Sequence, residues 1–166
     1  MKMKLLTRSL SLLTIASLTL FFANCGGDDP KTAPEKGALA KLSKTWNIVS
    51  ADLDGDDRTS DFLNFDLIIS GTFNSSNPEG PYDYEVTGNQ PVLSPWPQAP
   101  DGSGGTWTFG GTPESNSGQI ARNDRVGMFY VIDGDQLTLA FTLSQDAGYP
   151  ASKVSEVGGE WTFVFN

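Results

Sequence analysis

From residue 42 onward, apolar and polar residues alternate with a period of two, which is typical of β-strands that bury one face. The clearest alternation covers residues 63–73, and similar alternations cover 137–144 and 161–166. Shorter segments with the same pattern are Trp46–Ser50, Tyr82–Val86, Trp107–Phe109, Gln119–Arg122 and Val126–Ile132. No stretch has a convincing 3.6-residue apolar period. The pattern therefore predicts eight short strands with no helix between them.

The segments that join these strands are rich in Gly and Asp. Asp133-Gly134-Asp135 carries the Asp-Gly pair that suits a tight hairpin, so we expect the strands on either side to pair antiparallel. Eight successive strands without intervening helices predict an all-β fold, namely an antiparallel up-and-down β-barrel of about eight strands, with a β-sandwich as the alternative. Barrel closure would also remove the exposed sheet edges that promote aggregation.

The N-terminal segment has the features of an export signal. Basic residues precede an apolar run that ends at the single cysteine, Cys25. This arrangement resembles the lipobox of bacterial lipoproteins, and it predicts that residues 1–24 are a signal peptide and that the thiol of Cys25 carries lipid. An uncleaved membrane anchor is the alternative, since Leu5–Phe22 approaches the length of a spanning helix. Its six Ser and Thr residues favour the lipoprotein interpretation.

Residues 25–41 contain few large apolar side chains, so we expect them to form a flexible tether before a domain that spans 42–166. Gly26-Gly27-Asp28-Asp29-Pro30 resembles the acidic signal that sends Bacteroidetes lipoproteins to the outside of the outer membrane. The expected location is therefore the outer membrane, lipid-anchored and facing the cell exterior.

Charge and composition exclude several functions. Without residues 1–24, eight basic residues face 20 acidic ones, a net charge of −12, which disfavours nucleic-acid binding. The chain has no histidine, and its one cysteine is committed to lipid, so a Ser-His-Asp triad, a Cys-His pair and a His/Cys zinc site are excluded. With four Trp, ten Phe and four Tyr, aromatic burial should dominate the core.

Four segments carry a resemblance to a known group: Leu42–Trp46 (LSKTW), Gly105–Phe109 (GTWTF), Leu137–Thr142 (LTLAFT) and Gly159–Phe163 (GEWTF). Together they resemble the lipocalin-like lipoproteins of Bacteroidetes, a largely uncharacterised family. The resemblance covers residues 42–166 and implies a small up-and-down barrel on a lipid tether, with no established reaction. Trp46 is expected to cap one end of the core.

An acidic segment offers a candidate metal site. Asp52, Asp54 and Asp56 occupy the first, third and fifth positions of a calcium-type loop and would supply hard oxygen ligands for Ca²⁺. The sixth position holds Asp57 in place of glycine and the twelfth holds Leu63 in place of glutamate, which excludes an EF-hand. A looser calcium loop and a solvated hairpin between the first two strands are the remaining interpretations.

A long connection supplies candidate ligand-binding residues. Residues 88–105 contain four prolines and Trp96, whose ring would stack on a sugar or cover an apolar ligand. Alternatively, Trp96 folds back and plugs the barrel. Residues 145–158, with Tyr149, offer a similar loop. Arg122 and Arg125 lie in a polar turn that would clamp a carboxylate, or else form a hairpin tip held by an Arg-Asp pair.

Three functional hypotheses follow. The leading one is a non-enzymatic, lipid-anchored barrel that binds a small apolar or glycan ligand, or an envelope protein partner, through loops at one end. The second is a structural or accessory envelope lipoprotein whose barrel is filled by aromatic side chains. The third is a glycan hydrolase that uses paired carboxylates, a chemistry that does not need histidine. The free volume inside the barrel separates the first two hypotheses.

Overall fold

The computed structural model describes residues 33–97, 103–144, 154, 155 and 157–166. The chain divides into Met1–Lys31 and Thr32–Asn166, and all described residues belong to the second unit. Cys25 and the expected signal peptide therefore lie outside the described residues, as does Tyr149. Among the described residues, no helix is long and apolar enough to cross a membrane.

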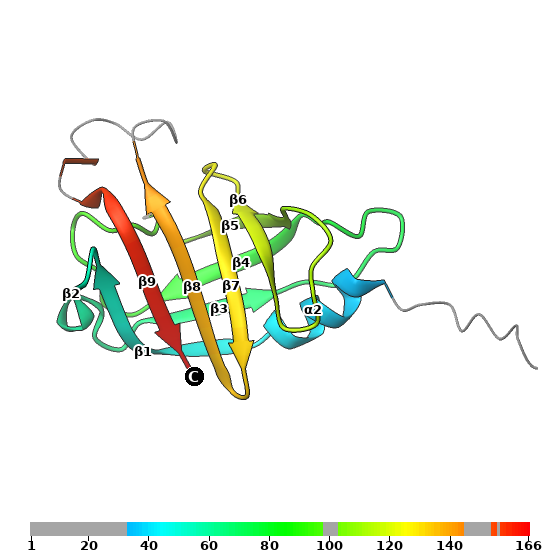
Figure 1. Ribbon diagram of the computed structural model, residues 1–166, viewed down its shortest axis with the longest axis horizontal. Helices are drawn as coiled ribbons and strands as arrows, with labels where there is room; N and C mark the ends of the chain where they lie inside the picture. The colour runs from blue at the N-terminus through cyan, green and yellow to red at the C-terminus, as the bar shows by residue number, and fades with distance from the viewer. Residues whose placement is uncertain (1–32, 98–102, 145–153, 156) are drawn as a thin grey trace, which may run out of the picture. The chain divides into compact units, whose positions relative to one another are not determined.

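The second unit is a closed antiparallel barrel of eight strands with one additional short strand (Figure 1). Consecutive strands pair from β3 to β9, β1 pairs with β3, and pairing of β1 with β9 closes the barrel. The predicted β-barrel is thereby confirmed, and the β-sandwich alternative is wrong. The strands are β1 (Thr45–Leu53), β2 (Asp56–Asp57), β3 (Asp66–Ser70), β4 (Tyr82–Thr87), β5 (Ser103–Phe109), β6 (Ser117–Arg122), β7 (Gly127–Asp133), β8 (Gln136–Leu143) and β9 (Gly159–Phe165).

Strand alternation places the large apolar side chains inside the barrel. In β8 and β9, the residues predicted to face the core are buried: Leu137, Leu139, Phe141, Leu143, Trp161, Phe163 and Phe165. Phe163 lies at the centre of this core, and its ring contacts six other aromatic rings. Aromatic side chains therefore fill the barrel, as the composition predicted.

The long alternation over residues 63–73 is only partly a strand. Leu63, predicted to be buried, is exposed, and the strand β3 begins three residues later. The chain before β3 forms a short 3₁₀ helix, η1 (Thr59–Phe62), and Asn64 has a φ of 56°, so the backbone turns there. Phe62 and Phe65 are fully buried on either side of this turn. The apolar residues of segment 62–70 therefore belong partly to a buried turn, with Phe62 and Phe65, and partly to strand β3.

Asp-Gly occurs at both tight hairpins but at different positions: Gly134-Asp135 form the β7–β8 loop, whereas Asp54-Gly55 form the β1–β2 loop. Asp133 pairs with Gln136 across the β7–β8 turn, where Gly134 has a φ of 59°, which confirms the predicted antiparallel hairpin. In the β1–β2 hairpin, Leu53 pairs with Asp56, and the two residues between them have positive φ. Positive φ at both central positions is the requirement of a type I′ turn, which Asp-Gly meets at low cost.

The expected tether is wrong for its second half, because a helix, α2 (Pro34–Leu42), begins there (Figure 1). Ala38, Leu39 and Leu42 are buried in the core, so the segment is held by packing. The Leu42 carbonyl accepts a hydrogen bond of 2.8 Å from the indole N–H of Trp46, which is itself buried. This bond ties the start of β1 to the end of α2, and the capping role of Trp46 stays a prediction.

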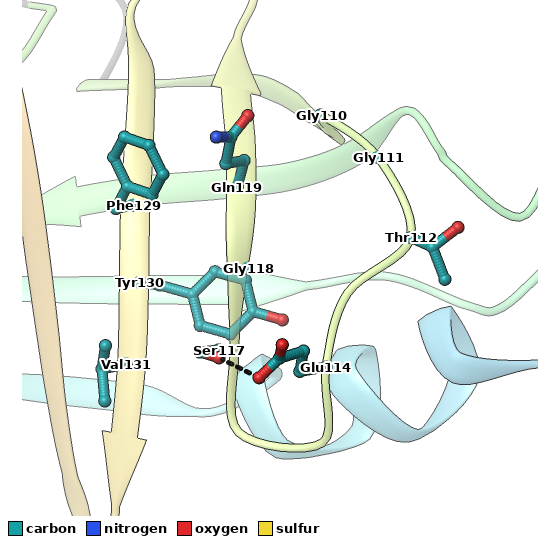
Figure 2. A pocket seen from close by; sticks show the side chains of 10 residues that line it. All are labelled: Gly110, Gly111, Thr112, Glu114, Ser117, Gly118, Gln119, Phe129, Tyr130 and Val131. Atoms are coloured by element: carbon teal, nitrogen blue, oxygen red, sulfur yellow. Dashed lines mark hydrogen bonds between the residues drawn. The ribbon is translucent and has the colours of Figure 1, made fainter.

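The β5–β6 loop also reaches α2. Lys41 on α2 donates hydrogen bonds to the backbone oxygen of Ser115 at 2.8 Å and to the side-chain oxygen of Asn116 at 2.6 Å. The same loop turns back along β6, where the Ser117 hydroxyl donates to the Glu114 carboxylate at 3.2 Å (Figure 2). These polar contacts thus hold the shape of this loop on the outside of the barrel.

Candidate functional site

The candidate site lies inside the barrel, where the β4–β5 connection inserts Trp96. Only 1% of Trp96 is exposed, and its ring contacts those of Phe65, Tyr84, Phe141 and Phe163 at centroid separations of 5.5–6.4 Å. Trp96 therefore plugs the barrel, as the second interpretation of this loop predicted. Its buried ring does not offer a surface on which a sugar could stack.

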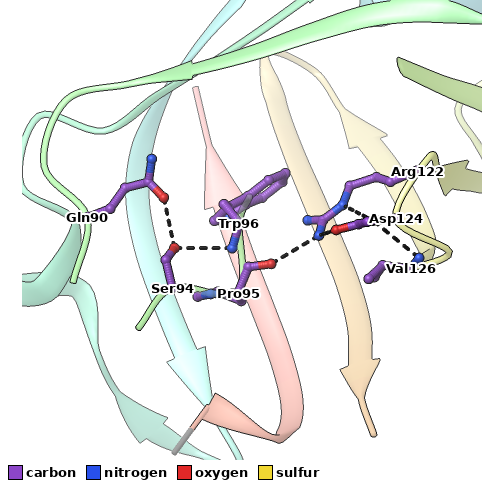
Figure 3. A network of polar contacts seen from close by, with 7 residues as sticks. All are labelled: Gln90, Ser94, Pro95, Trp96, Arg122, Asp124 and Val126. Atoms are coloured by element: carbon purple, nitrogen blue, oxygen red, sulfur yellow. Dashed lines mark hydrogen bonds and ion pairs between the residues drawn. The ribbon is translucent and has the colours of Figure 1, made fainter. Parts of the chain in front are cut away.

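Polar contacts hold the plug in place (Figure 3). The Ser94 hydroxyl accepts a hydrogen bond of 3.1 Å from the backbone N–H of Trp96 and donates one of 2.8 Å to the side-chain oxygen of Gln90. The loop is therefore folded on itself around a buried serine. This local network fixes the backbone that carries Trp96, so the position of the ring does not depend on ring packing alone.

Arg122 provides the second attachment of the plug. Its buried guanidinium donates a hydrogen bond of 3.1 Å to the Pro95 carbonyl and lies 5.0 Å from the centre of the Trp96 ring. It also forms an ion pair with Asp124 and donates to the same carboxylate from Nε at 3.0 Å. The Arg-Asp interpretation of this turn is thus the one that the geometry supports. Nε and Nη2 of this guanidinium are bound to Asp124 and Pro95, so they are not available to clamp a ligand carboxylate.

Two buried polar atoms beside Arg122 have no hydrogen-bond partner in the structure, namely the hydroxyl of Tyr84 and the indole nitrogen of Trp96. Burial raises the pKa of the Tyr84 phenol to about 12, because removal from water disfavours the phenolate; Arg122 lowers this pKa and Asp124 raises it. Tyr84 is therefore a neutral hydrogen-bond donor at physiological pH. Sequence reasoning missed this role, since the alternation of β4 indicates only that Tyr84 faces inward.

The space left in the barrel is small. A cavity of about 10 Å³ remains between Tyr84, Trp96, Trp107, Arg122 and neighbouring aliphatic side chains. That is about the volume needed by one water molecule, whereas pockets for small molecules usually measure about 300–1,000 Å³. With Trp96 in place, the interior does not accommodate a ligand.

The remaining predicted ligand-binding arginine lies apart from the plug. Arg125 is exposed, has a φ of 72° and occupies the tip of the β6–β7 hairpin. The hairpin is closed by a hydrogen bond of 2.9 Å from the Arg125 N–H to the Arg122 carbonyl. The two arginines therefore share a turn, but only Arg122 enters the barrel.

The acidic segment forms the β1–β2 hairpin. Asp52 accepts a hydrogen bond of 2.8 Å from the N–H of Gly55, and Asp54 accepts one of 2.7 Å from the N–H of Glu160. Asp56 is exposed on the short strand β2. Nowhere in the described part of the chain do three or more Asp, Glu, Cys or His side chains come together to hold a metal ion. The calcium loop stays a prediction, and the geometry is that of the solvated hairpin.

Comparison of the chain with protein-family models, with curated proteins and with solved structures found no match.

Proposed function

We propose that this chain is a lipid-anchored, non-enzymatic accessory protein of the outer membrane that works through the outside of its barrel. Cys25 carries the lipid, and the domain faces the cell exterior, as the N-terminal sequence predicts. The resemblance of residues 42–166 to the lipocalin-like lipoproteins of Bacteroidetes supports this assignment. Its partners are another envelope protein or a glycan at the cell surface.

The observation that carries the proposal is the filled interior. Trp96 occupies the space in which a barrel of this size would hold one small ligand, and the cavity left beside it between described side chains measures about 10 Å³. The free volume inside the barrel separates the ligand-binding hypothesis from the accessory hypothesis. A filled interior supports the accessory role. Recognition then takes place on side chains that point outward from the strands and on the loops.

The distribution of carboxylates favours binding over catalysis. Glu35 on α2 is the buried acidic side chain among the residues that the structure describes, and the other described Asp and Glu side chains are partly or fully exposed. Glycoside hydrolysis needs two carboxyl groups facing each other across a cleft at a fixed separation. A single buried carboxyl does not meet that requirement.

A gated binding barrel is the second candidate. It is favoured by the unpartnered Tyr84 hydroxyl and Trp96 indole nitrogen, since buried polar groups normally find partners. In this alternative a ligand displaces Trp96 from the barrel and hydrogen-bonds to Tyr84. The two candidates differ in how strongly Trp96 is held.

The test uses the full chain produced with its signal sequence in a Gram-negative host. Metabolic labelling with an alkyne fatty acid should mark the wild-type protein and leave the Cys25→Ala variant unlabelled and outside the membrane fraction. Protease treatment of intact cells should degrade the wild-type domain if it faces the exterior. A labelled Cys25→Ala variant, or a wild-type protein without label, would contradict the anchor.

Thermal unfolding of the detergent-purified protein tests the filled interior. Fatty acids should leave the midpoint unchanged, because the barrel has no room for an acyl chain. A ligand present at 100 times its dissociation constant adds about 2.7 kcal/mol to the free energy of unfolding. A fatty acid with that effect would contradict the solid barrel and favour the gated alternative. Calcium in the same assay tests the acidic hairpin.

A further inference from the structure

A groove of about 380 Å³ lies on the outside of the barrel, where the β5–β6 loop runs beside β6 and β7 (Figure 2). Gly110, Gly111 and Thr112 of the loop line one side of it, and Phe129 and Val131 of β7 line the other. Its volume is within the range of sites for small molecules, unlike that of the interior cavity. The groove is therefore separate from the site built around Trp96.

Two glycines that line the groove have different roles. At Gly118, an added Cβ would lie 2.9 Å from Cε1 of Tyr130, 3.1 Å from its hydroxyl oxygen and 3.1 Å from Cβ of Pro113. Gly118 therefore makes room for the buried Tyr130 ring, which lies across β6 at this residue in Figure 2. Gly111, by contrast, has no atom within 4 Å of an added Cβ, so the loop side of the groove borders open space.

An apolar wall borders this space. Phe129 is 60% exposed and Val131 is 50% exposed, although the outward positions of a strand in an acidic protein normally carry polar residues. Their neighbours on the paired strand β8 are Ala140 and Thr138, which are also uncharged. The Phe129 ring is available for contact with a ligand, and its burial would remove a large apolar area from water.

Polar groups face the same space. Gln119 and Glu114 supply an amide and a carboxylate, both exposed. Tyr130, by contrast, is 1% exposed, and its hydroxyl, which has no hydrogen-bond partner among the described residues, is buried and not accessible from the groove. Burial raises the pKa of Tyr130 to about 12. The groove therefore offers donors and acceptors through Gln119 and Glu114.

The chemistry of these groups restricts the ligand. None of the described residues that line the groove is a lysine or an arginine, so nothing there would neutralise a phosphate or a carboxylate. The protein is itself strongly acidic, which repels anions further. A hydroxyl-rich neutral molecule can donate to Glu114 and exchange hydrogen bonds with Gln119.

We propose that this groove binds a neutral carbohydrate, with the ring of Phe129 against the apolar face of a sugar and the sugar hydroxyls bonded to Gln119 and Glu114. The inference rests on the proposed function in one respect, because it requires recognition outside the barrel. It deepens that function by naming the ligand class and the residues that recognise it.

The experiment is calorimetric titration of the full-length protein in detergent with neutral tetrasaccharides of glucose, mannose, galactose and xylose. We expect at least one to bind the wild type. Phe129→Ala should weaken that binding about tenfold, which corresponds to the loss of roughly one ring contact. The matched control is Val49→Ala, since Val49 is also a half-exposed apolar residue but does not line the groove.

Gln119→Ala provides a second readout. The variant removes an exposed amide that lines the groove, so the unfolding midpoint should change little while carbohydrate affinity falls several-fold. Equal carbohydrate affinity in wild type and Gln119→Ala would overturn the role of this amide in the groove.

Failure of the inference is distinguishable from failure of the proposed function. If no tetrasaccharide binds, or if tetramethylammonium binds in their place, the carbohydrate site is overturned while the lipid anchor and the filled barrel stand. If a tetrasaccharide binds with equal affinity to Phe129→Ala but loses affinity for Trp96→Phe, the ligand enters the barrel, and the proposed function is overturned as well.

Discussion

Replacement of Trp96 by alanine tests whether the plug is part of the folded core. The ring is almost completely buried and packs against four other aromatic rings. Burial of about 150–250 Å² of aromatic side chain at about 25 cal/mol per Å² corresponds to roughly 4–6 kcal/mol. Measured Trp→Ala and Phe→Ala replacements in cores cost about 3–5 kcal/mol. We therefore expect Trp96→Ala to lower the free energy of unfolding by about 3–5 kcal/mol.

Urea unfolding followed by far-UV circular dichroism measures this change without relying on tryptophan fluorescence. Val92→Ala is the matched control, because Val92 lies in the same loop but is 90% exposed, and it should change stability by less than about 0.5 kcal/mol. Trp96→Phe keeps a buried ring and should cost less than Trp96→Ala. If Trp96→Ala costs under about 1 kcal/mol, the ring is not an integral part of the core, and the argument for a solid barrel fails.

A small aromatic molecule should partly restore the Trp96→Ala variant. Dry apolar cavities of about 150 Å³ bind benzene, and the space vacated by an indole ring is bounded by Phe65, Tyr84, Phe141 and Phe163. Added indole should raise the unfolding midpoint of Trp96→Ala and leave that of the wild type unchanged. Equal effects on both proteins would mean that indole acts elsewhere.

Three further predictions concern other parts of the core. Asp124→Asn removes the charge that pairs with a buried guanidinium and should cost about 1.5–3 kcal/mol in chemical denaturation, whereas the exposed Asp135→Asn should cost less than about 0.5 kcal/mol. Tyr84 and Tyr130 both have a pKa raised to about 12, so above pH 10 the folded state keeps protons that the unfolded state releases. The free energy of unfolding should therefore be fully present below pH 10 and decline toward pH 12. The decline should be less steep in the variant that combines Tyr84→Phe and Tyr130→Phe. Leu39→Ala should cost about 2–5 kcal/mol, because α2 packs on the core; an unchanged unfolding midpoint would restore the tether interpretation.

Much of the fold was predictable because strand alternation is a local property of the chain. A side chain two positions along a strand points to the same side, so Leu137, Leu139 and Phe141 identify their strand and its buried face without knowledge of its neighbours. The Asp-Gly hairpin at Gly134 was predictable for a similar reason, since its positive φ is a requirement of the turn itself. Both signals depend on residues only a few positions apart.

The helix α2 and the exposed position of Leu63 were not predictable in this way. The helix has only three buried apolar residues, Ala38, Leu39 and Leu42, which is a weak periodic signal, and it is held by contacts with residues far along the chain. Leu63 follows the alternation of β3 but precedes the strand, because the chain turns at Asn64. In both cases tertiary contacts outweigh the local pattern.

Two residues of the candidate site were predicted, but their contact with each other was not. Arg122 and Trp96 were both singled out from the sequence, but their separation of 26 residues gave no reason to bring them together. The outward position of Phe129 was readable, since it alternates with the buried Met128 and Tyr130, yet an exposed apolar residue by itself is common. Its neighbours in the groove come from a different strand and a loop.

The sequence by itself determined the number of strands in the barrel, the side of most strands that is buried and the tight hairpin at Gly134, and it predicts the lipid anchor. These follow from local periodicity, turn chemistry and the N-terminal motif. The tertiary structure decided that Trp96 fills the barrel, that Arg122 is bound to Asp124 and Pro95, and that an open groove lies outside near Phe129. Free volume is what remains after residues distant in sequence have packed together, and no local pattern of residues specifies it.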